Sequence, residues 1–111
     1  MKPMKIGFFC CYGKHFVYIL YSQSIDRFYI GETIDVENRL SEHNEHFFTG
    51  AFTSKANDWT VFLTLECKNR TQARMIESHI KRMKSKTYIH NLKKYSRMRE
   101  DLIAKYDMPD C

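Results

Sequence analysis

Residues 17–33, VYILYSQSIDRFYIGET, form the stretch that decides the fold. Two short runs rich in aromatic and β-branched residues, 16–22 and 28–33, flank a polar break, and this pattern is typical of a β-hairpin. In a hairpin with an even-numbered loop, an even and an odd position share one face. Tyr18 and Tyr29 are therefore expected on the same side of the hairpin.

The tyrosines of this hairpin need an explanation, because a plain core would favour Phe and Leu, which carry no polar atom that needs a partner. Taken singly, 7 tyrosines in 111 residues are consistent with ordinary core and rim positions. A shared face would instead bring the phenols of Tyr18 and Tyr29 to one site. Gly31 would then let a ligand or another backbone approach closely. On the hairpin alone, both interpretations stay open.

The pattern after the hairpin is helical. Thr33 or Asp35 can cap this helix, and its apolar face follows at spacings of four, three and four residues. That face consists of Val36, Leu40, His43 and Phe47. His43 thus lies on the apolar stripe, with Arg39 at its edge. Arginine offers a planar fork to phosphate oxygens, and histidine can relay a proton near neutral pH. The alternative is an exposed arginine beside a packed histidine.

One more strand and two more helices are expected in the rest of the chain. Residues 47–58 are typical of a loop, and residues 59–67, WTVFLTLEC, form the strongest strand by β propensity. A helix follows this strand, and a last helix is expected over residues 88–106. The order β, β, α, β, α, α predicts an α+β fold, in which helices pack on a small mixed sheet.

The helix after the third strand carries an isolated acid. Asn69 or Thr71 can cap this helix. Its core stripe is Ala73, Ile76, Ile80 and Met83. Glu77 lies on the flank of the stripe, where Lys81 at i+4 or Arg74 at i−3 can pair with it. A carboxylate in a positive field is also what a phosphodiester-cleaving site needs, because a hard oxygen ligand can hold Mg²⁺ beside the scissile phosphate.

Positive charge is concentrated in the second half of the chain. Residues 1–66 contain 6 Lys or Arg and 8 Asp or Glu, whereas residues 67–111 contain 12 and 5. Residues 68–99 hold 11 basic residues and a single acid, Glu77. A face this basic suggests a polyanion, most simply nucleic acid, and the alternative is a solvated helix surface. The candidate nucleic-acid contacts are Arg74, Lys81, Arg82, Lys84 and Lys86.

Length and composition predict one domain with a modest core. The chain has 111 residues, of which 43% are apolar. No run approaches the roughly 20 apolar residues that a membrane helix needs, so no membrane contact and a cytoplasmic location are expected. The four cysteines form no CxxC motif and are expected to be reduced. The predicted organisation is a flexible leader over 1–13, the domain over 14–95, and a C-terminal helix end and tail over 96–111.

Together, these residues resemble the GIY-YIG endonuclease family, and more narrowly its short single-domain bacterial members. Residues 17–18 correspond to the first motif and residues 29–31 to the second. Arg39 and His43 follow on the next helix, and Glu77 lies on the helix after the third strand. The resemblance covers most of the chain, and the order and spacing of five elements make it far more specific than any one of them.

The resemblance implies a three-stranded antiparallel sheet flanked by helices, and hydrolysis of DNA with one divalent metal, Mg²⁺ or Mn²⁺. By analogy, Glu77 would bind the metal and Arg39 would hold the phosphate. Tyr18 would be the leading general base, Tyr29 would position phosphate or water, and His43 would assist proton transfer. Because an unperturbed phenol has a pKa of about 10, this base needs the metal and Arg39 to favour the phenolate.

Three positions depart from the family's pattern. Phe16 stands where the first motif usually has glycine, and Glu32 follows the second motif where some members have lysine. A second carboxylate near a phosphate is repulsive unless it turns to solvent or contacts the metal. The late asparagine of many members has an approximate counterpart in Asn91, 14 residues after Glu77. Gly31, which belongs to the second motif, and Asn91 are treated as possible supporting site residues.

The preferred hypothesis is a metal-dependent DNA endonuclease, nicking or structure-selective, in DNA repair or recombination. RNA is an alternative substrate. One alternative function is a non-catalytic nucleic-acid-binding module of the same fold, and another is a nuclease subunit that needs a partner protein. The intact set of site residues favours catalysis, since a binding module needs only the charge. The small size of the chain favours the alternatives.

Overall fold

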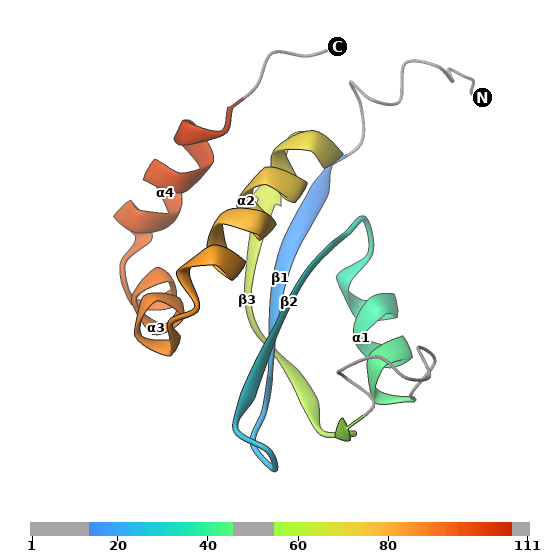
Figure 1. Ribbon diagram of the computed structural model, residues 1–111. Helices are drawn as coiled ribbons and strands as arrows, with labels where there is room; N and C mark the ends of the chain where they lie inside the picture. Colours follow the sequence, from blue (N-terminus) through green and yellow to red (C-terminus); the bar gives the residue numbers. More distant parts are fainter. Residues whose placement is uncertain (1–13, 46–54, 108–111) are drawn as a thin grey trace, which may run out of the picture.

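The computed structural model describes residues 14–45 and 55–107 as three strands and four helices (Figure 1). The strands are β1 His15–Ser22, β2 Arg27–Thr33 and β3 Trp59–Cys67. The helices are α1 Val36–Asn44, α2 Arg70–Met83, α3 Lys86–Lys94 and α4 Ser96–Lys105. None of the described helices has the length and apolar character that spanning a lipid bilayer requires. The predicted leader and Phe47 lie outside the described residues.

The sheet has the strand order β2-β1-β3, and both pairs of neighbouring strands are antiparallel. The α+β architecture with a three-stranded antiparallel sheet is confirmed, whereas the mixed sheet expected from element order alone is wrong. In the hairpin, Tyr18 lies opposite Gly31, and Leu20 lies opposite Tyr29. Residues opposite each other in an antiparallel pair point to the same face, so the predicted shared face of Tyr18 and Tyr29 is confirmed.

The two faces of the sheet carry separate hydrophobic cores. The helices α2, α3 and α4 cover one face, and α1 lies against the other (Figure 1). Val17 and Ile19 point to the three-helix face and pack against residues of all three helices. Tyr18 and Leu20 alternate with them and point to the α1 face, where they pack with Trp59. Strand β1 is therefore buried on both sides, between two edge strands.

Two of the predicted helix caps are formed, at Asp35 and Asn69. Each side chain accepts a hydrogen bond from the backbone N–H three residues later, at 3.0 and 2.9 Å respectively. The C-terminal end of α2 differs from the prediction, because Met83 is 45% exposed and does not extend the core stripe. The helix ends at Lys84, whose left-handed backbone (φ 47°) cannot continue it.

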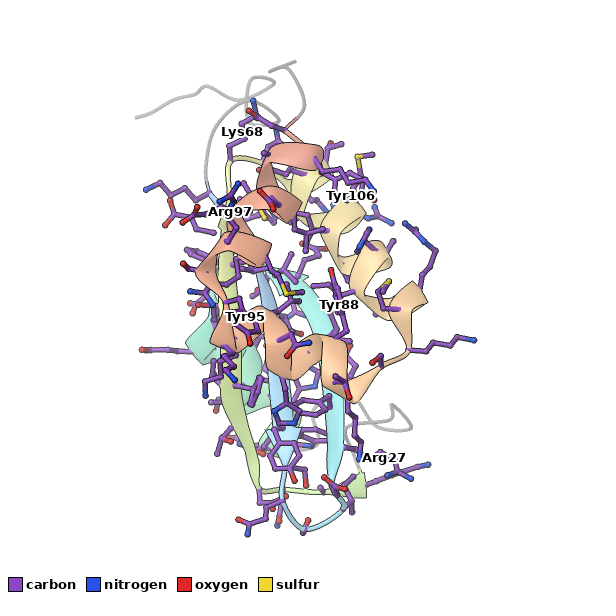
Figure 2. All side chains as sticks on the ribbon, turned by 90° about the vertical axis from the view of Figure 1, so that its left-hand side faces the viewer. Arg27, Lys68, Tyr88, Tyr95, Arg97 and Tyr106 are labelled. Carbon is purple, nitrogen blue, oxygen red and sulfur yellow. The ribbon has the colours of Figure 1, made fainter. Side chains whose placement is uncertain are left out.

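The prediction of a single helix over residues 88–106 is wrong, because α3 and α4 are separate helices. They meet at Tyr95, whose backbone is extended (φ −112°, ψ 107°). In one straight helix Leu92 and Leu102 would point about 80° apart, whereas the break lets both enter the core on the three-helix face. Arg99 Nη1 donates to two carbonyl oxygens at the end of α3, at 2.6 and 2.8 Å. The boundary predicted at residue 95 thus falls between two helices that share one core (Figure 2).

Candidate active site

A buried pair of polar side chains joins β1 to α1. Tyr18 Oη and His43 Nε2 lie 3.0 Å apart, within hydrogen-bonding distance. The two residues are only 2% and 3% exposed. A buried polar atom without a partner is costly, so each group satisfies the other. The partner that His43 needs on the apolar stripe of α1 is therefore the phenol of Tyr18.

Tyr29 completes a cluster of three rings on the α1 face. Its ring centroid lies 6.2 Å from that of Tyr18 and 4.8 Å from that of His43. Tyr29 is half-buried, whereas the other two residues are buried. Strand alternation and the first helix of the fold thus bring together three of the five residues predicted as catalytic, and only Tyr29 among the three keeps substantial contact with solvent.

Gly31 makes room for the phenol of Tyr18. A Cβ atom built at this glycine would lie 2.5 Å from Tyr18 Oη and 2.7 Å from its Cζ. Real Cβ atoms do not approach other atoms so closely. The expectation that the glycine provides space for a ligand or another backbone is therefore wrong at this position, because the space is already occupied by a side chain of the neighbouring strand.

Burial keeps the phenol of Tyr18 protonated. Desolvation is the main cause that raises its pKa well above the ordinary value of 10, and the neighbouring Tyr29 adds to the effect. The positive charge of Arg39 lowers the pKa but does not offset burial, and the carboxylates of Glu77 and Glu32 raise it further. The chain by itself therefore does not favour the phenolate that a Tyr18 general base requires.

The imidazole of His43 is kept neutral by the same environment. Burial lowers its pKa from the ordinary value of 6.5, and the positive charge of Arg39 acts in the same direction, while Glu42 opposes both. A neutral imidazole carries one N–H and one acceptor nitrogen. A protonated Tyr18 and a neutral His43 can thus share a hydrogen bond and can pass a proton between Oη and Nε2.

Arg39 and Glu77 approach this cluster from different helices. Arg39 lies on α1, its side chain is 38% exposed, and its Nε is 3.5 Å from a carboxylate oxygen of Glu42. Glu77 lies on α2, which packs on the other face of the sheet. The charges of Arg39 and Glu77 both act on the phenol of Tyr18, and the half-buried Tyr29 lies on the edge strand β2. The more exposed side of the candidate site is therefore at β2 (Figure 1).

The carboxylate of Glu77 is engaged in an ion pair within α2. Lys81 Nζ lies 2.7 Å from its Oε2, and the Glu77 side chain is only 19% exposed. Of the two readings left open by the sequence, the intrahelical pair with Lys81 is therefore formed. A pair of this i,i+4 kind contributes only a few tenths of a kcal/mol, so it does not prevent Glu77 from exchanging Lys81 for another cation.

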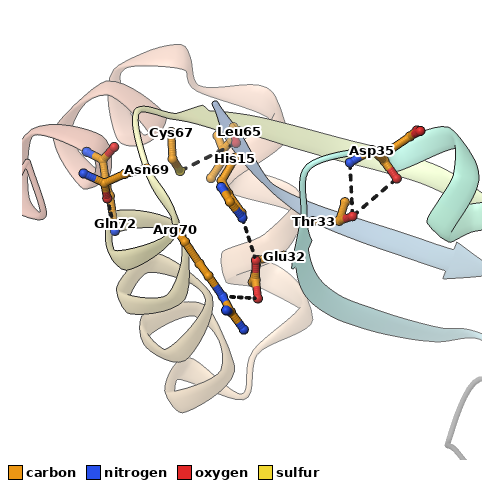
Figure 3. A network of polar contacts seen from close by, with 9 residues as sticks. All are labelled: His15, Glu32, Thr33, Asp35, Leu65, Cys67, Asn69, Arg70 and Gln72. Atoms are coloured by element: carbon orange, nitrogen blue, oxygen red, sulfur yellow. Dashed lines mark hydrogen bonds and ion pairs between the residues drawn. The ribbon is translucent and has the colours of Figure 1, made fainter. Parts of the chain in front are cut away.

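Glu32 has two partners that the sequence did not single out. Figure 3 shows it between His15 of β1 and Arg70 of α2, with oxygen–nitrogen distances of 3.7 and 3.6 Å. Its side chain is 17% exposed, so it does not simply turn to solvent. Among the described residues, His15 Nδ1 is buried without a hydrogen-bond partner. The one signal in the sequence for the position of Glu32 was strand alternation. It places Glu32 on the same face as Val17, its partner on β1, and α2 covers that face.

In the described part of the chain, the other predicted site residues make no direct contact with the ring cluster of Tyr18, Tyr29 and His43. Asn91 lies on α3 and is half-buried, and its backbone carbonyl accepts a hydrogen bond from Tyr95. All five candidate nucleic-acid contacts are exposed. One of them, Lys86, is 2.9 Å from Asp26 and so ties α3 to the hairpin turn. The five residues thus leave a basic surface, part of which is already paired.

A divalent cation would have few protein ligands among the described residues. Within residues 14–45 and 55–107, no group of three or more His, Cys, Asp or Glu side chains is arranged to hold a metal ion. Mg²⁺ in nucleotide-processing sites keeps several waters and is commonly bound through one or two carboxylates together with substrate phosphates. A site built on Glu77 alone therefore fits this cation, provided that Lys81 moves aside.

Comparison with known proteins agrees with the geometry. The family model described as the GIY-YIG catalytic domain matches residues 14–96, which is most of the chain. The match begins just before β1 and ends at the first residue of α4, so it contains the ring cluster, Arg39 and Glu77. No curated protein and no solved structure matches the chain significantly.

Proposed function

The chain belongs to the GIY-YIG family, and on that premise we propose that it is a metal-dependent endonuclease that hydrolyses phosphodiester bonds in DNA. The family implies nuclease-type activity. The observation that carries the finer proposal is the buried hydrogen bond between Tyr18 and His43, which lies within reach of the charges of Arg39 and Glu77. A module that only binds nucleic acid needs positive charge, and it does not need a buried polar cluster of this kind.

Arg39 is the proposed phosphate-holding group. Its partly exposed guanidinium offers two parallel donors to phosphate oxygens, and such contacts strengthen as negative charge develops in the transition state. Glu77 would hold Mg²⁺ or Mn²⁺, and the ion would supply further positive charge beside the phosphate. The half-buried Tyr29 would position the phosphate or the attacking water.

Tyr18 and His43 would act as one proton-transfer unit. Because the protonated phenol can pass its own proton to the neutral imidazole, Tyr18 can act as the base without first forming a free phenolate. Tyr18 Oη would accept a proton from the attacking water while its own proton passes to Nε2 of His43 over their 3.0 Å hydrogen bond. The basic surface formed by Arg74, Lys81, Arg82, Lys84 and Lys86 would hold the DNA backbone, and the proposed role is nicking or structure-selective cleavage in repair or recombination.

A nicking assay on supercoiled plasmid tests the proposal. Wild type should nick with Mg²⁺ or Mn²⁺ and should be inactive in EDTA. Glu77→Gln and Tyr18→Phe should each lower the rate by at least about 100-fold, the usual size of a general acid–base or metal contribution. Glu100→Gln is the charge-matched control for Glu77→Gln, because it also removes one negative charge, at an exposed position of α4. The proposal fails if wild type and Glu77→Gln behave alike across a panel of DNA structures and metals.

A non-catalytic nucleic-acid-binding module is the second candidate. The observations that favour it are the ion pair between Glu77 and Lys81 and the strongly disfavoured phenolate of Tyr18. Binding that weakens steeply with salt while no cleavage appears would support this reading. Cleavage that appears only after a partner protein is added would instead support a nuclease subunit.

A further inference from the structure

A second concave surface lies between α2 and the segment that follows α4. Its cavity has a volume of about 500 Å³. The lining residues are Thr71, Arg74, Met75, Ser78, Arg82 and Tyr106. Two guanidinium groups and three hydroxyl groups therefore line one hollow, and none of the lining side chains is acidic. This composition is suited to an anion that carries several acceptor oxygens.

Arg74 and Arg82 give this cavity its charge. Both are exposed, and among the described residues Arg74 makes no ion pair, so its guanidinium is not neutralised there. The nearest acid in the sequence, Glu77, is already paired with Lys81. Eight residues separate the two arginines, which corresponds to about 12 Å along a helix axis. The two groups can thus contact more than one phosphate of a strand.

Tyr106 holds one of these arginines in place. Arg82 Nη2 donates a hydrogen bond to Tyr106 Oη at 3.4 Å, and the same oxygen lies 3.0 Å from His79 Nδ1. Figure 2 shows Tyr106 beside α2, at the end of α4. Burial and then the positive charges of Lys105 and Arg82 lower the pKa of His79. The imidazole of His79 therefore favours its neutral form beside Tyr106.

We propose that this cavity binds a phosphate of the nucleic-acid backbone other than the one that is cut. Arg74 lies one turn before Glu77 on α2, and Arg82 lies more than one turn after it, so the cavity and the proposed metal ligand belong to the same helix. The identity of the ligand rests on the proposed function, whereas the anion site itself rests on the lining residues. Arg82, positioned by Tyr106, is the principal contact, and Ser78 and Thr71 add hydroxyl donors.

Binding of a labelled DNA duplex in EDTA tests this site without requiring cleavage. Arg82→Gln should weaken binding by about tenfold, and the slope of log K against log salt should become shallower by about one unit. Tyr106→Phe should cause a smaller loss, because it keeps the ring and removes only the oxygen that Arg82 contacts. Arg97→Gln removes the same charge outside the cavity and should change affinity and slope much less.

The outcomes separate this site from the catalytic proposal. If Arg82→Gln and Arg97→Gln lower affinity equally, the cavity is not a phosphate site, whether or not the protein cleaves DNA. If wild type never cleaves but Arg82→Gln shows the specific loss, the endonuclease proposal fails and the site stands. Titration with orthophosphate distinguishes the source of the phosphate. Tight orthophosphate binding that Arg82→Gln abolishes, together with unchanged DNA affinity, would overturn the assignment to nucleic acid.

Discussion

Gly31 lies directly opposite Tyr18 in the β1–β2 ladder, and a Cβ atom at Gly31 would lie 2.5 Å from Tyr18 Oη. The missing side chain is thus what allows the phenol to stay buried against the edge strand and to contact His43 at 3.0 Å. The glycine of the second motif and the tyrosine of the first are two parts of one packing arrangement, although 13 positions separate them in the sequence.

We expect Gly31→Ala to lower the free energy of unfolding by about 1–3 kcal/mol, the usual cost of forcing an extra methyl into a packed site. It should also lower activity, because the phenol is displaced from His43. Urea denaturation measures the first effect. In a Tyr18→Leu background the same substitution should cost much less, since the crowded atoms of the ring are absent. An equal cost in both backgrounds would contradict the assigned contact.

Stability should fall when the pH is lowered through the range in which free histidine titrates. Burial lowers the pKa of His43 in the folded state, so the unfolded chain binds a proton first. The contribution of His43 is therefore complete above about pH 6.5 and is lost progressively below it. Urea midpoints measured between pH 8 and pH 5 test this expectation. His79 has a pKa lowered in the same direction, so His43→Gln and His79→Gln should each flatten part of the profile.

Lys81→Gln should leave stability nearly unchanged, within about 0.5 kcal/mol, because an i,i+4 ion pair within one helix contributes little. It should tighten the binding of Mn²⁺, since the carboxylate of Glu77 no longer has a competing cation. Titration calorimetry with Mn²⁺ measures the affinity. Arg97→Gln, which removes a cation elsewhere, should not change it. Weaker Mn²⁺ binding in Lys81→Gln than in this control would argue against Glu77 as the ligand.

Glu32→Lys should destabilise the fold by roughly 1–3 kcal/mol, because it places a cation in a poorly exposed position beside Arg70 and His15. The appropriate control is Glu100→Lys, which changes the net charge equally at an exposed position of α4. Thermal unfolding of both variants gives the comparison. Similar melting temperatures for the two variants would show that the contacts of Glu32 do not support the fold.

The local pattern of the sequence was sufficient for the strands and for most of the helices. Strand alternation has a period of two, so it predicted correctly that Tyr18 and Tyr29 share a face. The caps at Asp35 and Asn69 could also be predicted locally, because a capping side chain accepts a hydrogen bond from a backbone N–H only three residues away. The break at Tyr95 was missed, since the reason for it is the burial of Leu92 and Leu102 in one core.

The amino-acid sequence by itself determined which groups are available: two phenols on one face, an arginine and a histidine one helical turn apart, and a carboxylate among many cations. Only the tertiary structure decided which of them are charged and which are in contact. Burial keeps Tyr18 protonated and His43 neutral, and the side chain of Tyr18 on β1 fills the space at Gly31 on β2. The pairing of Glu32 with Arg70 was decided in the same way. The physical reason is that periodicity is a property of a few neighbouring residues, whereas desolvation and contact depend on segments that are distant in the chain.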